Sequence, residues 1–395
     1  MKYASVTDRL ATLGGQKWAV HELARRMASE GGDIIELTIG EPDVPTPALL
    51  VDEACSAMRR GRTAYSNGRG EDHLRQALAK RYSDRLNMSV TEQQILCFPG
   101  TQTALYAVMR GIVEHGDEVL VGDPMYASYE GVIASSGATM VPVPLRPEFG
   151  FRLQAEDLAA KITKNSQAIL LNTPHNPTGA VSTPEEIEKI GALVKKHDLW
   201  LIVDEVYEEL VFSTASFCSP MAFSDLASRV IVVSSISKSW AAPGFRSGWC
   251  VATEAFCDRL LSLSETMLFG NQPFIADMTT LAVSRWSETA KDMANRFEKR
   301  ADLLMERLHK NTGLKVLQPH GGMFAVVDVS ATGISGYDYA MELLKTKGVA
   351  VMPGNAFGAS LENWIRIALT IDDTLLSQAC DRIIAHEQTR MEEAI

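Results

Sequence analysis

Lys238 lies in a segment whose residue types suit chemistry on an anionic ligand that carries a carbonyl group. The segment 234–249 reads SSISKSWAAPGFRSGW, with Ser235 and Ser237 before the lysine and Arg246 after it. Serine hydroxyls and an arginine guanidinium bind phosphate groups, whereas a lysine amine attacks a carbonyl carbon only in its neutral form. Because burial and a nearby positive charge both lower the pKa of a lysine, we expect the protein interior and Arg246 to activate Lys238.

Other polar side chains fall at the ends of predicted strands. The apolar, β-rich runs at 118–123, 167–173, 199–205 and 229–235 are typical of buried parallel strands, and predicted helices alternate with them, at 101–116 and 183–197. This alternation indicates an α/β sandwich with a parallel sheet, in which ligands bind at the carboxyl ends of the strands. The side chains that fall at or just beyond those ends are Tyr126, Asn176, Asp204, Tyr207, Ser235, Ser237 and Lys238.

These residue types match one cofactor. A carboxylate, an amide, a phenol and a lysine suit a ligand with a protonated ring nitrogen, a phenolate oxygen and an aldehyde, and pyridoxal 5′-phosphate has all three groups. Its phosphate needs N–H groups at the start of a helix, which Gly100, Thr101 and Gln102 would supply at the beginning of the predicted helix 101–116. We therefore predict a pyridoxal phosphate site, with Lys238 at the aldehyde.

Composition restricts the possible partners and the compartment. With 395 residues the chain exceeds what one hydrophobic core usually fills, so two packed lobes are expected. The net charge of −11 argues against a nucleic-acid partner, and no apolar run reaches the roughly 18 residues of a membrane span. The six cysteines are scattered without metal-ligand spacing, which predicts no metal site and a reducing, cytoplasmic location.

The pattern changes after about residue 270 and predicts a second, smaller lobe. One long helical stretch at 277–310 is followed by strands at 321–329, 348–354 and 364–370 and by a last helix, which indicates an α+β lobe. We expect three parts: residues 1–45 as an N-terminal segment packing with the small domain, 46–275 as the large cofactor domain, and 276–395 as the small domain. A further helix is predicted at 16–30.

Several motifs in this order resemble the class I and II aminotransferases, which are fold type I pyridoxal-phosphate enzymes related to aspartate aminotransferase. They are LTIGEPDVPTP (37–47), TAYSNGRGEDHLRQAL (63–78), NTPHNPTG (172–179), DEVY (204–207), SxSKxxxxxGxRxG (235–248) and WIRIAL (364–369). The resemblance implies a large domain with a mainly parallel seven-stranded sheet and a smaller α+β domain. It also implies transamination of an α-amino acid with a 2-oxo acid by a ping-pong mechanism.

The resemblance also assigns roles around the cofactor. Lys238 would form a Schiff base and then shuttle a proton, Asp204 would keep the pyridine nitrogen protonated, and Tyr126 would stack on the ring. Asn176 and Tyr207 would bind the phenolic oxygen. The phosphate would be bound by Gly100, Thr101, Gln102, Ser235, Ser237 and Arg246, with Tyr65 reaching the phosphate of the neighbouring subunit of a homodimer.

The substrate carboxylate would be bound by Arg366, assisted by Asn176 and by the backbone of Gly40. Without the resemblance, Arg366 would be interpreted as a surface charge on an edge strand. The identity of the substrate stays open: Gln102 stands where the aspartate-using branch often has lysine, and segment 17–25 resembles a bacterial arginine–pyruvate transaminase-like subgroup.

Two alternatives stay open at this level. Trp18 and His21 would either face the substrate side chain or form the packed face of an N-terminal helix. The same site could also support β- or γ-elimination, as in pyridoxal-phosphate-dependent C–S lyases, because the fate of the substrate depends on how its side chain is positioned.

Overall fold

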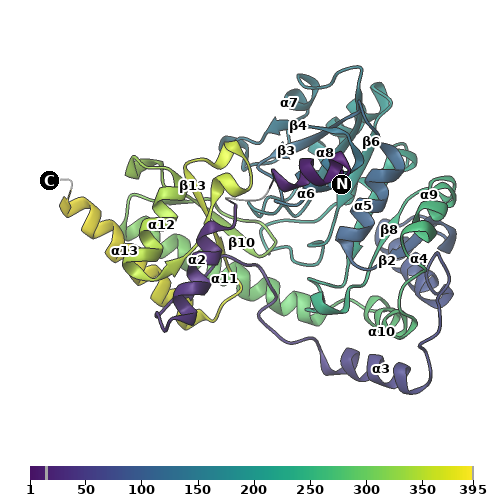
Figure 1. The fold of residues 1–395 in the computed structure, drawn as a ribbon, viewed down its shortest axis with the longest axis horizontal. Helices are drawn as coiled ribbons and strands as arrows, with labels where there is room; N and C mark the ends of the chain where they lie inside the picture. The colour runs from purple at the N-terminus through teal and green to yellow at the C-terminus, as the bar shows by residue number, and fades with distance from the viewer. Residues whose placement is uncertain (14–16, 394–395) are drawn as a thin grey trace.

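The computed structural model describes residues 1–13 and 17–393, which are arranged around three β-sheets (Figure 1). The strands are β1 (Ile35–Glu36), β2 (Ile95–Phe98), β3 (Glu118–Asp123), β4 (Thr139–Pro144), β5 (Ser166–Asn172), β6 (Trp200–Asp204), β7 (Val230–Ser235), β8 (Gly248–Val251), β9 (Lys315–Val316), β10 (Phe324–Asp328), β11 (Val349–Ala350), β12 (Met352–Pro353) and β13 (Trp364–Ala368). The α-helices are α1 (Ser5–Ala11), α2 (Ala19–Ser29), α3 (Ala48–Arg59), α4 (Asp72–Leu86), α5 (Thr101–Ile112), α6 (Tyr129–Ser136), α7 (Ala155–Ala159), α8 (Pro184–Lys196), α9 (Glu254–Met267), α10 (Pro273–Val283), α11 (Glu288–Asn311), α12 (Gly336–Lys347) and α13 (Asp373–Glu393).

The largest sheet has seven strands in the order β2-β8-β7-β6-β5-β3-β4. All neighbouring strands are parallel except β8, which is antiparallel to both β2 and β7. The sheet is buried on both faces: on β6, Leu201 and Val203 belong to one hydrophobic core and Ile202 to the other. Helices α5, α6 and α9 cover the Ile202 side, and α4, α8 and α10 cover the opposite side. The predicted fold class is confirmed.

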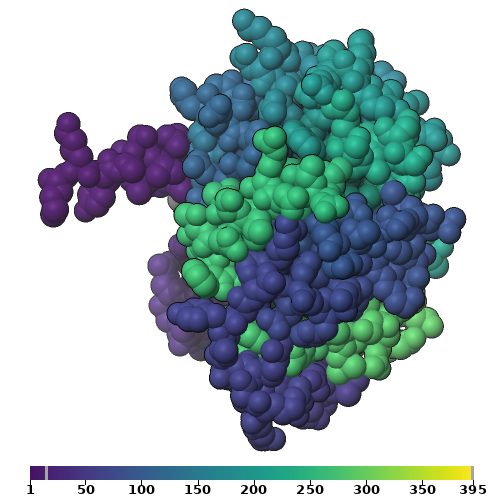
Figure 2. Space-filling model, turned by 90° about the vertical axis from the view of Figure 1, so that its right-hand side faces the viewer, coloured from purple at the N-terminus to yellow at the C-terminus, as the bar shows by residue number. Residues whose placement is uncertain are grey.

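A four-stranded antiparallel sheet, β12-β13-β10-β9, forms the centre of the second lobe, at the left of Figure 1. Its core is shared with α11, α12 and α13 and includes Val20 and Ala24 of α2. The first helix lies elsewhere: α1 packs against α6 beside the large sheet, and Figure 2 shows the N-terminal residues projecting from one side of the molecule. No helix within the described ranges has the length and apolarity to cross a membrane.

Most predicted elements occur where the sequence places them, with two corrections. The stretch 277–310 is not one helix, because α10 ends at Val283 and α11 begins at Glu288. The predicted strand 348–354 is two short strands: β11 pairs with β1, and β12 pairs with β13. The helix predicted at 16–30 is observed as α2, and residue 16 lies outside the described residues.

The N-terminus of α8 illustrates why local prediction succeeds there. Thr183 caps the helix, its side chain accepting from the backbone N–H of Glu186, while the Glu186 side chain accepts from the N–H of Thr183. Pro184 occupies the first helical position, where a missing N–H costs nothing. All the required groups are within four consecutive residues, so no tertiary contact is needed to specify this helix start.

Candidate active site

A cavity lies where β5, β6 and β7 end and where β13 of the smaller sheet faces them. It encloses about 1000 Å³ of empty space, part of it open to solvent. The parallel register places Asn172 of β5 beside Asp204 of β6 at this edge. The predicted site residues that line the cavity are Gly40, Thr101, Gln102, Tyr126, Asn176, Asp204, Tyr207, Ser235, Ser237, Lys238, Arg246 and Arg366.

Lys238 reaches the cavity from the segment after β7. Its Nζ donates to the carbonyl oxygen of Gly40 at 3.0 Å. Burial lowers the pKa of Lys238 to about 8; the charges of Arg366 and Arg246 act in the same direction, and the exposed Glu41 opposes them. The expected activation by burial and by Arg246 is thus confirmed in direction, while the contribution of Arg366 was not foreseen.

Asp204 is a buried carboxylate at the end of β6. Its Oδ1 accepts from the backbone N–H of Val206 at 3.2 Å, and its Oδ2 accepts from the hydroxyl of Tyr129 at 2.8 Å. Burial raises the pKa of Asp204 to about 6, although both donors and the positive charge of Lys238 favour the ionised form. Such a carboxylate would be stabilised by a cationic group placed beside it in the cavity.

Asn176 contacts polar groups from three other parts of the site: Arg366, Tyr207 and Asn172. Its Oδ1 accepts from Arg366 Nη1 at 3.1 Å, and its side chain also interacts with that of Tyr207. Its backbone N–H donates to Asn172 Oδ1 at 2.8 Å, and Asn172 Nδ2 donates to the carbonyl oxygen of Asp204 at 2.9 Å. The ends of β5 and β6 are therefore fixed to each other by a continuous hydrogen-bonded chain.

Arg366 is buried on β13, between β12 and β10. Its guanidinium lies between the rings of Phe324 and Phe357, at 3.9 Å and 4.3 Å from their centroids, and its Nη2 donates to the carbonyl oxygen of Thr38 at 2.5 Å. Burial lowers the pKa of Arg366 to about 9. Its Nε has no hydrogen-bond partner among the described residues. The interpretation of Arg366 as a surface charge is wrong, and the side chain is instead available to an anion in the cavity.

The N-terminus of α5 forms a polar end of the cavity. Gly100 precedes the helix with a φ of +85°, and a Cβ at this position would lie 2.1 Å from Arg246 Nη2. Only glycine therefore lets the guanidinium approach the free N–H groups of the first turn. The hydroxyl oxygen of Thr101 is buried without a hydrogen-bond partner in the described part of the chain. This arrangement of donors suits an anion.

Three residues considered from the sequence, Gly100, Tyr65 and His21, are not among those that line the cavity. The side chain of Tyr65 is 86% exposed and packs edge-to-face on Phe269 instead. His21 also lies outside the lining, with its Nδ1 at 2.8 Å from Thr38 Oγ1, whereas Trp18 contributes to the lining. Of the pair left open by the sequence, Trp18 faces the cavity and His21 does not.

Four residues with evident roles were missed by sequence reasoning: Tyr129, Asn172, Phe324 and Phe357. Asn172 was within reach, because it lies next to the end of the predicted strand 167–173 and opens the NTPHNPTG motif. The two phenylalanines lie in different segments and meet only around Arg366. No local pattern could have placed their rings together.

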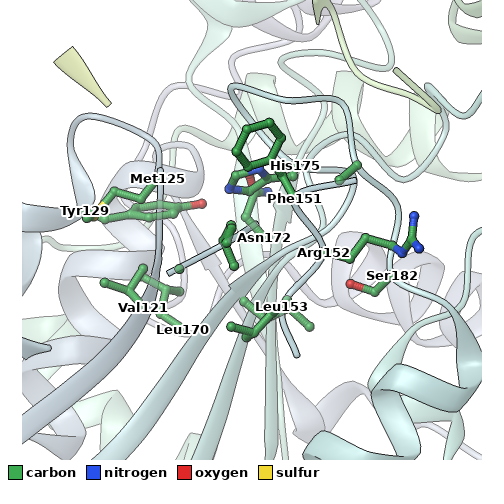
Figure 3. Close-up of a pocket in the computed structure, with 14 residues that line it drawn as sticks. Val121, Met125, Tyr129, Phe151, Arg152, Leu153, Leu170, Asn172, His175 and Ser182 are labelled. Carbon is green, nitrogen blue, oxygen red and sulfur yellow. The ribbon is translucent and has the colours of Figure 1, made fainter. Parts of the chain in front are cut away.

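A smaller cavity lies beside the first and contains about 370 Å³ of empty space, part of it open to solvent. Figure 3 shows Tyr129, Asn172 and His175 on its wall together with Met125 and Phe151. Burial lowers the pKa of His175 to about 4, so its ring is neutral near pH 7, and its Nδ1 lies 2.7 Å from Thr178 Oγ1. The remaining lining is mostly apolar, including Val121, Leu145, Leu153 and Leu170.

Comparisons with known proteins agree with this geometry. The model of the family "Aminotransferase class I and II" matches residues 32–383. An arginine–pyruvate transaminase of Pseudomonas aeruginosa is 40% identical over 383 residues, which are 97% of each chain. A probable aspartate/prephenate aminotransferase of Aquifex aeolicus is 32% identical and covers 91% of this chain and 92% of its own length.

Solved structures show the same fold. The aspartate aminotransferase of Thermus thermophilus determined with maleate superimposes with a TM-score of 0.90 at 29% identity, covering 98% of this chain and 100% of its own. The aspartate aminotransferase of Rhizobium meliloti superimposes with a TM-score of 0.93 at 26% identity, covering 99% of both chains.

Proposed function

The chain belongs to the class I and II aminotransferases, and we propose that it performs transamination with pyridoxal 5′-phosphate bound in the cavity described above. The observation that carries the cofactor proposal is the meeting of Lys238, Asp204, Asn176 and Tyr207 at neighbouring strand ends. An aminotransferase moves an amino group from an α-amino acid to a 2-oxo acid. Because one buried guanidinium, Arg366, is available to bind either carboxylate, donor and acceptor would bind in turn, as in a ping-pong mechanism.

The residues present fit the cofactor. Lys238 would hold its aldehyde carbon, Asp204 would pair with the protonated ring nitrogen, and Tyr126 would cover a ring face. The amide of Asn176 and the hydroxyl of Tyr207 interact with each other and could both contact the phenolic oxygen. The groups available to the phosphate are the N-terminal N–H groups of α5, Thr101 Oγ1, Gln102, Ser235, Ser237 and Arg246.

When bound, pyridoxal phosphate supplies an electron sink that stabilises negative charge at the substrate Cα and stores the amino group between the two half-reactions. Asp204 contributes by keeping a positive charge on the ring nitrogen, which a buried carboxylate with two fixed donors does without rearrangement. Lys238 Nζ is the group placed to take the proton from the substrate Cα and to return it. Arg366 binds the substrate α-carboxylate and so orients the Cα toward Lys238.

The uptake of the cofactor is expected to depend on pH through Lys238. Since only the neutral amine attacks the aldehyde and the pKa of Lys238 is about 8, the rate of uptake by cofactor-free protein should rise with pH and level off above about pH 8. Near pH 6 roughly one lysine in a hundred is neutral. Stopped-flow absorbance at a series of pH values measures this rate. A rate still rising tenfold per pH unit at pH 9 would contradict the lowered pKa.

The charges in the cavity argue against a dicarboxylic donor. Among the described residues, the cationic side chains of the lining are Lys238, Arg246 and Arg366, and each already has a proposed partner. A second substrate carboxylate would therefore be buried without a counter-charge from this subunit, which is costly. The indole of Trp18 instead offers an aromatic face to a long cationic side chain. We propose arginine as donor and pyruvate as acceptor, supported by the 40% identity to the arginine–pyruvate transaminase.

Steady-state assays with pyruvate as acceptor test this donor. The kcat/KM for arginine should exceed that for aspartate by at least about tenfold, equivalent to about 1.4 kcal/mol. Replacing Trp18 with alanine should lower kcat/KM for arginine but leave that for alanine as donor unchanged, because the short side chain does not reach the indole. A preference for aspartate would refute the donor assignment and leave the cofactor proposal intact.

We also propose that the active form is a cytoplasmic homodimer. The exposed Tyr65 and Phe269 form an apolar patch, and the N-terminal residues around α1 project from the surface (Figure 2). Tyr65 is not among the residues that line the cavity of its own subunit, and a second subunit would bring it to the phosphate of the partner. The described structure has all six cysteines free, which supports a reducing compartment. Light scattering of the purified protein measures the assembly.

A further inference from the structure

Tyr129 is a buried tyrosine at the start of α6, and its hydroxyl donates to Asp204 Oδ2 at 2.8 Å. Its side chain is 1% exposed. Its ring also packs edge-to-face on Tyr126, with 5.5 Å between centroids and 83° between planes, and its backbone N–H donates to the carbonyl oxygen of Tyr126 at 3.0 Å. Tyr129 thus contacts both Asp204, which is proposed to bind the ring nitrogen of the cofactor, and Tyr126, which is proposed to stack on the cofactor ring.

The hydrogen bonds of Asp204 show what this hydroxyl does. Oδ1 is held by the backbone N–H of Val206, which lies on the same chain segment, so this bond alone leaves the carboxylate free to rotate about its Cβ–Cγ axis. The bond from Tyr129 comes from a different element, and the two together fix the plane of the carboxylate. Figure 3 shows the hydroxyl end of Tyr129 directed toward Asn172, which is the neighbour of Asp204 in the sheet.

We propose that Tyr129 is a positioning residue for transamination, whose hydroxyl keeps Asp204 ionised and in the orientation that binds the protonated ring nitrogen of the cofactor. The proposal rests on the proposed function, since it requires a cofactor beside Asp204. The charged and titratable groups that act on Asp204 are Tyr129, Glu205 and Lys238, and Tyr207 also interacts with it. Burial and Glu205 raise the pKa of Asp204, whereas Tyr129 and Lys238 lower it. Removal of the hydroxyl therefore raises this pKa further, so Asp204 loses its charge at a higher pH.

The test compares Tyr129→Phe with Tyr339→Phe, a matched control. Tyr339 is fully buried in α12 of the other lobe, so its substitution removes the same hydroxyl far from Asp204. Tyr129→Phe should lower kcat about tenfold or more with little change in KM, because it removes a hydrogen bond to a charged group that the reaction uses. Tyr339→Phe should leave kcat unchanged.

A second readout does not depend on turnover. Cofactor affinity is measured from pH 5 to 8 by quenching of tryptophan fluorescence, with Lys238→Ala as background so that Lys238 does not titrate. Cofactor affinity should decrease at low pH as Asp204 becomes protonated. Tyr129→Phe should raise the midpoint pH of this decrease by about one unit. The phosphate of the cofactor titrates equally in both proteins and cancels in the comparison.

A double-mutant cycle with Asp204→Asn then separates positioning from packing. If Tyr129 acts through Asp204, Tyr129→Phe should have no further effect on kcat once Asp204 is asparagine. Equal effects in both backgrounds, or superimposable affinity curves, would overturn the proposal. Should Tyr129→Phe fail to fold, incorporation of 3-fluorotyrosine at position 129 makes the hydroxyl a stronger hydrogen-bond donor and should lower the midpoint pH at which cofactor affinity is lost. An unchanged midpoint would also overturn the proposal. Absence of cofactor binding by the wild-type protein would instead refute the proposed function.

Discussion

Replacing Lys238 with alanine is expected to lower kcat by about 10⁴-fold, because a positioned proton-transfer group alone contributes about 10²–10⁴-fold and the covalent attachment of the cofactor is lost as well. The side chain contacts the carbonyl oxygen of Gly40 and otherwise faces the cavity, so the fold should persist. The visible absorbance band of the bound cofactor should disappear or shift to that of free pyridoxal phosphate.

The measurement combines an absorption spectrum with a turnover assay on the same preparation. Lys164→Ala serves as a control, since Lys164 is an exposed lysine whose removal should change neither spectrum nor kcat. Turnover of Lys238→Ala within about tenfold of the wild type, which is about 1.4 kcal/mol in activation free energy, would rule out Lys238 as the proton-transfer group.

Replacing Arg366 with alanine should lower kcat/KM by about 30-fold or more for every α-amino acid, since truncating one partner of a buried charge pair costs about 2–5 kcal/mol. The effect should be uniform across donors because the α-carboxylate is common to all of them. The guanidinium held between Phe324 and Phe357, with its Nε unpaired in the described structure, is already oriented for that carboxylate.

Two comparisons make the Arg366 prediction specific. The affinity for pyridoxal phosphate should stay near the wild-type value, because the proposed contacts of Arg366 are with the substrate. Arg366→Lys should recover little activity, since an ammonium cannot make the bidentate contact of a guanidinium. A loss confined to one amino acid would place Arg366 at the substrate side chain instead of the α-carboxylate.

Much of the site could be predicted because its residues lie at the ends of strongly patterned strands. The runs around Leu201 and Ile231 are continuous and apolar, as expected of strands buried on both faces, and the parallel sheet then brings their carboxyl ends together. This topology alone was enough to predict that Lys238, Asp204 and Asn176 lie close together.

The remaining features depend on contacts between distant segments. Ser287, which caps α11, donates its hydroxyl to the carbonyl oxygen of Ser239, and its backbone N–H donates to Glu209. These tertiary bonds fix the break between α10 and α11 that the helical periodicity did not reveal. The role of Tyr129 likewise depends on its hydrogen bond to Asp204, which is 75 positions away in the chain. The short strands β11 and β12 are distinct only because they pair with strands of different sheets.

The most direct test of transamination in this cavity is the addition of L-arginine to cofactor-loaded wild-type protein without any 2-oxo acid. Transamination should convert the visible band to a band in the near ultraviolet and release a single equivalent of 2-oxo acid per subunit, and pyruvate should then restore the visible band. Continuous release of ammonia and 2-oxo acid with an unchanged visible band would show an elimination reaction and contradict amino-group transfer in this cavity.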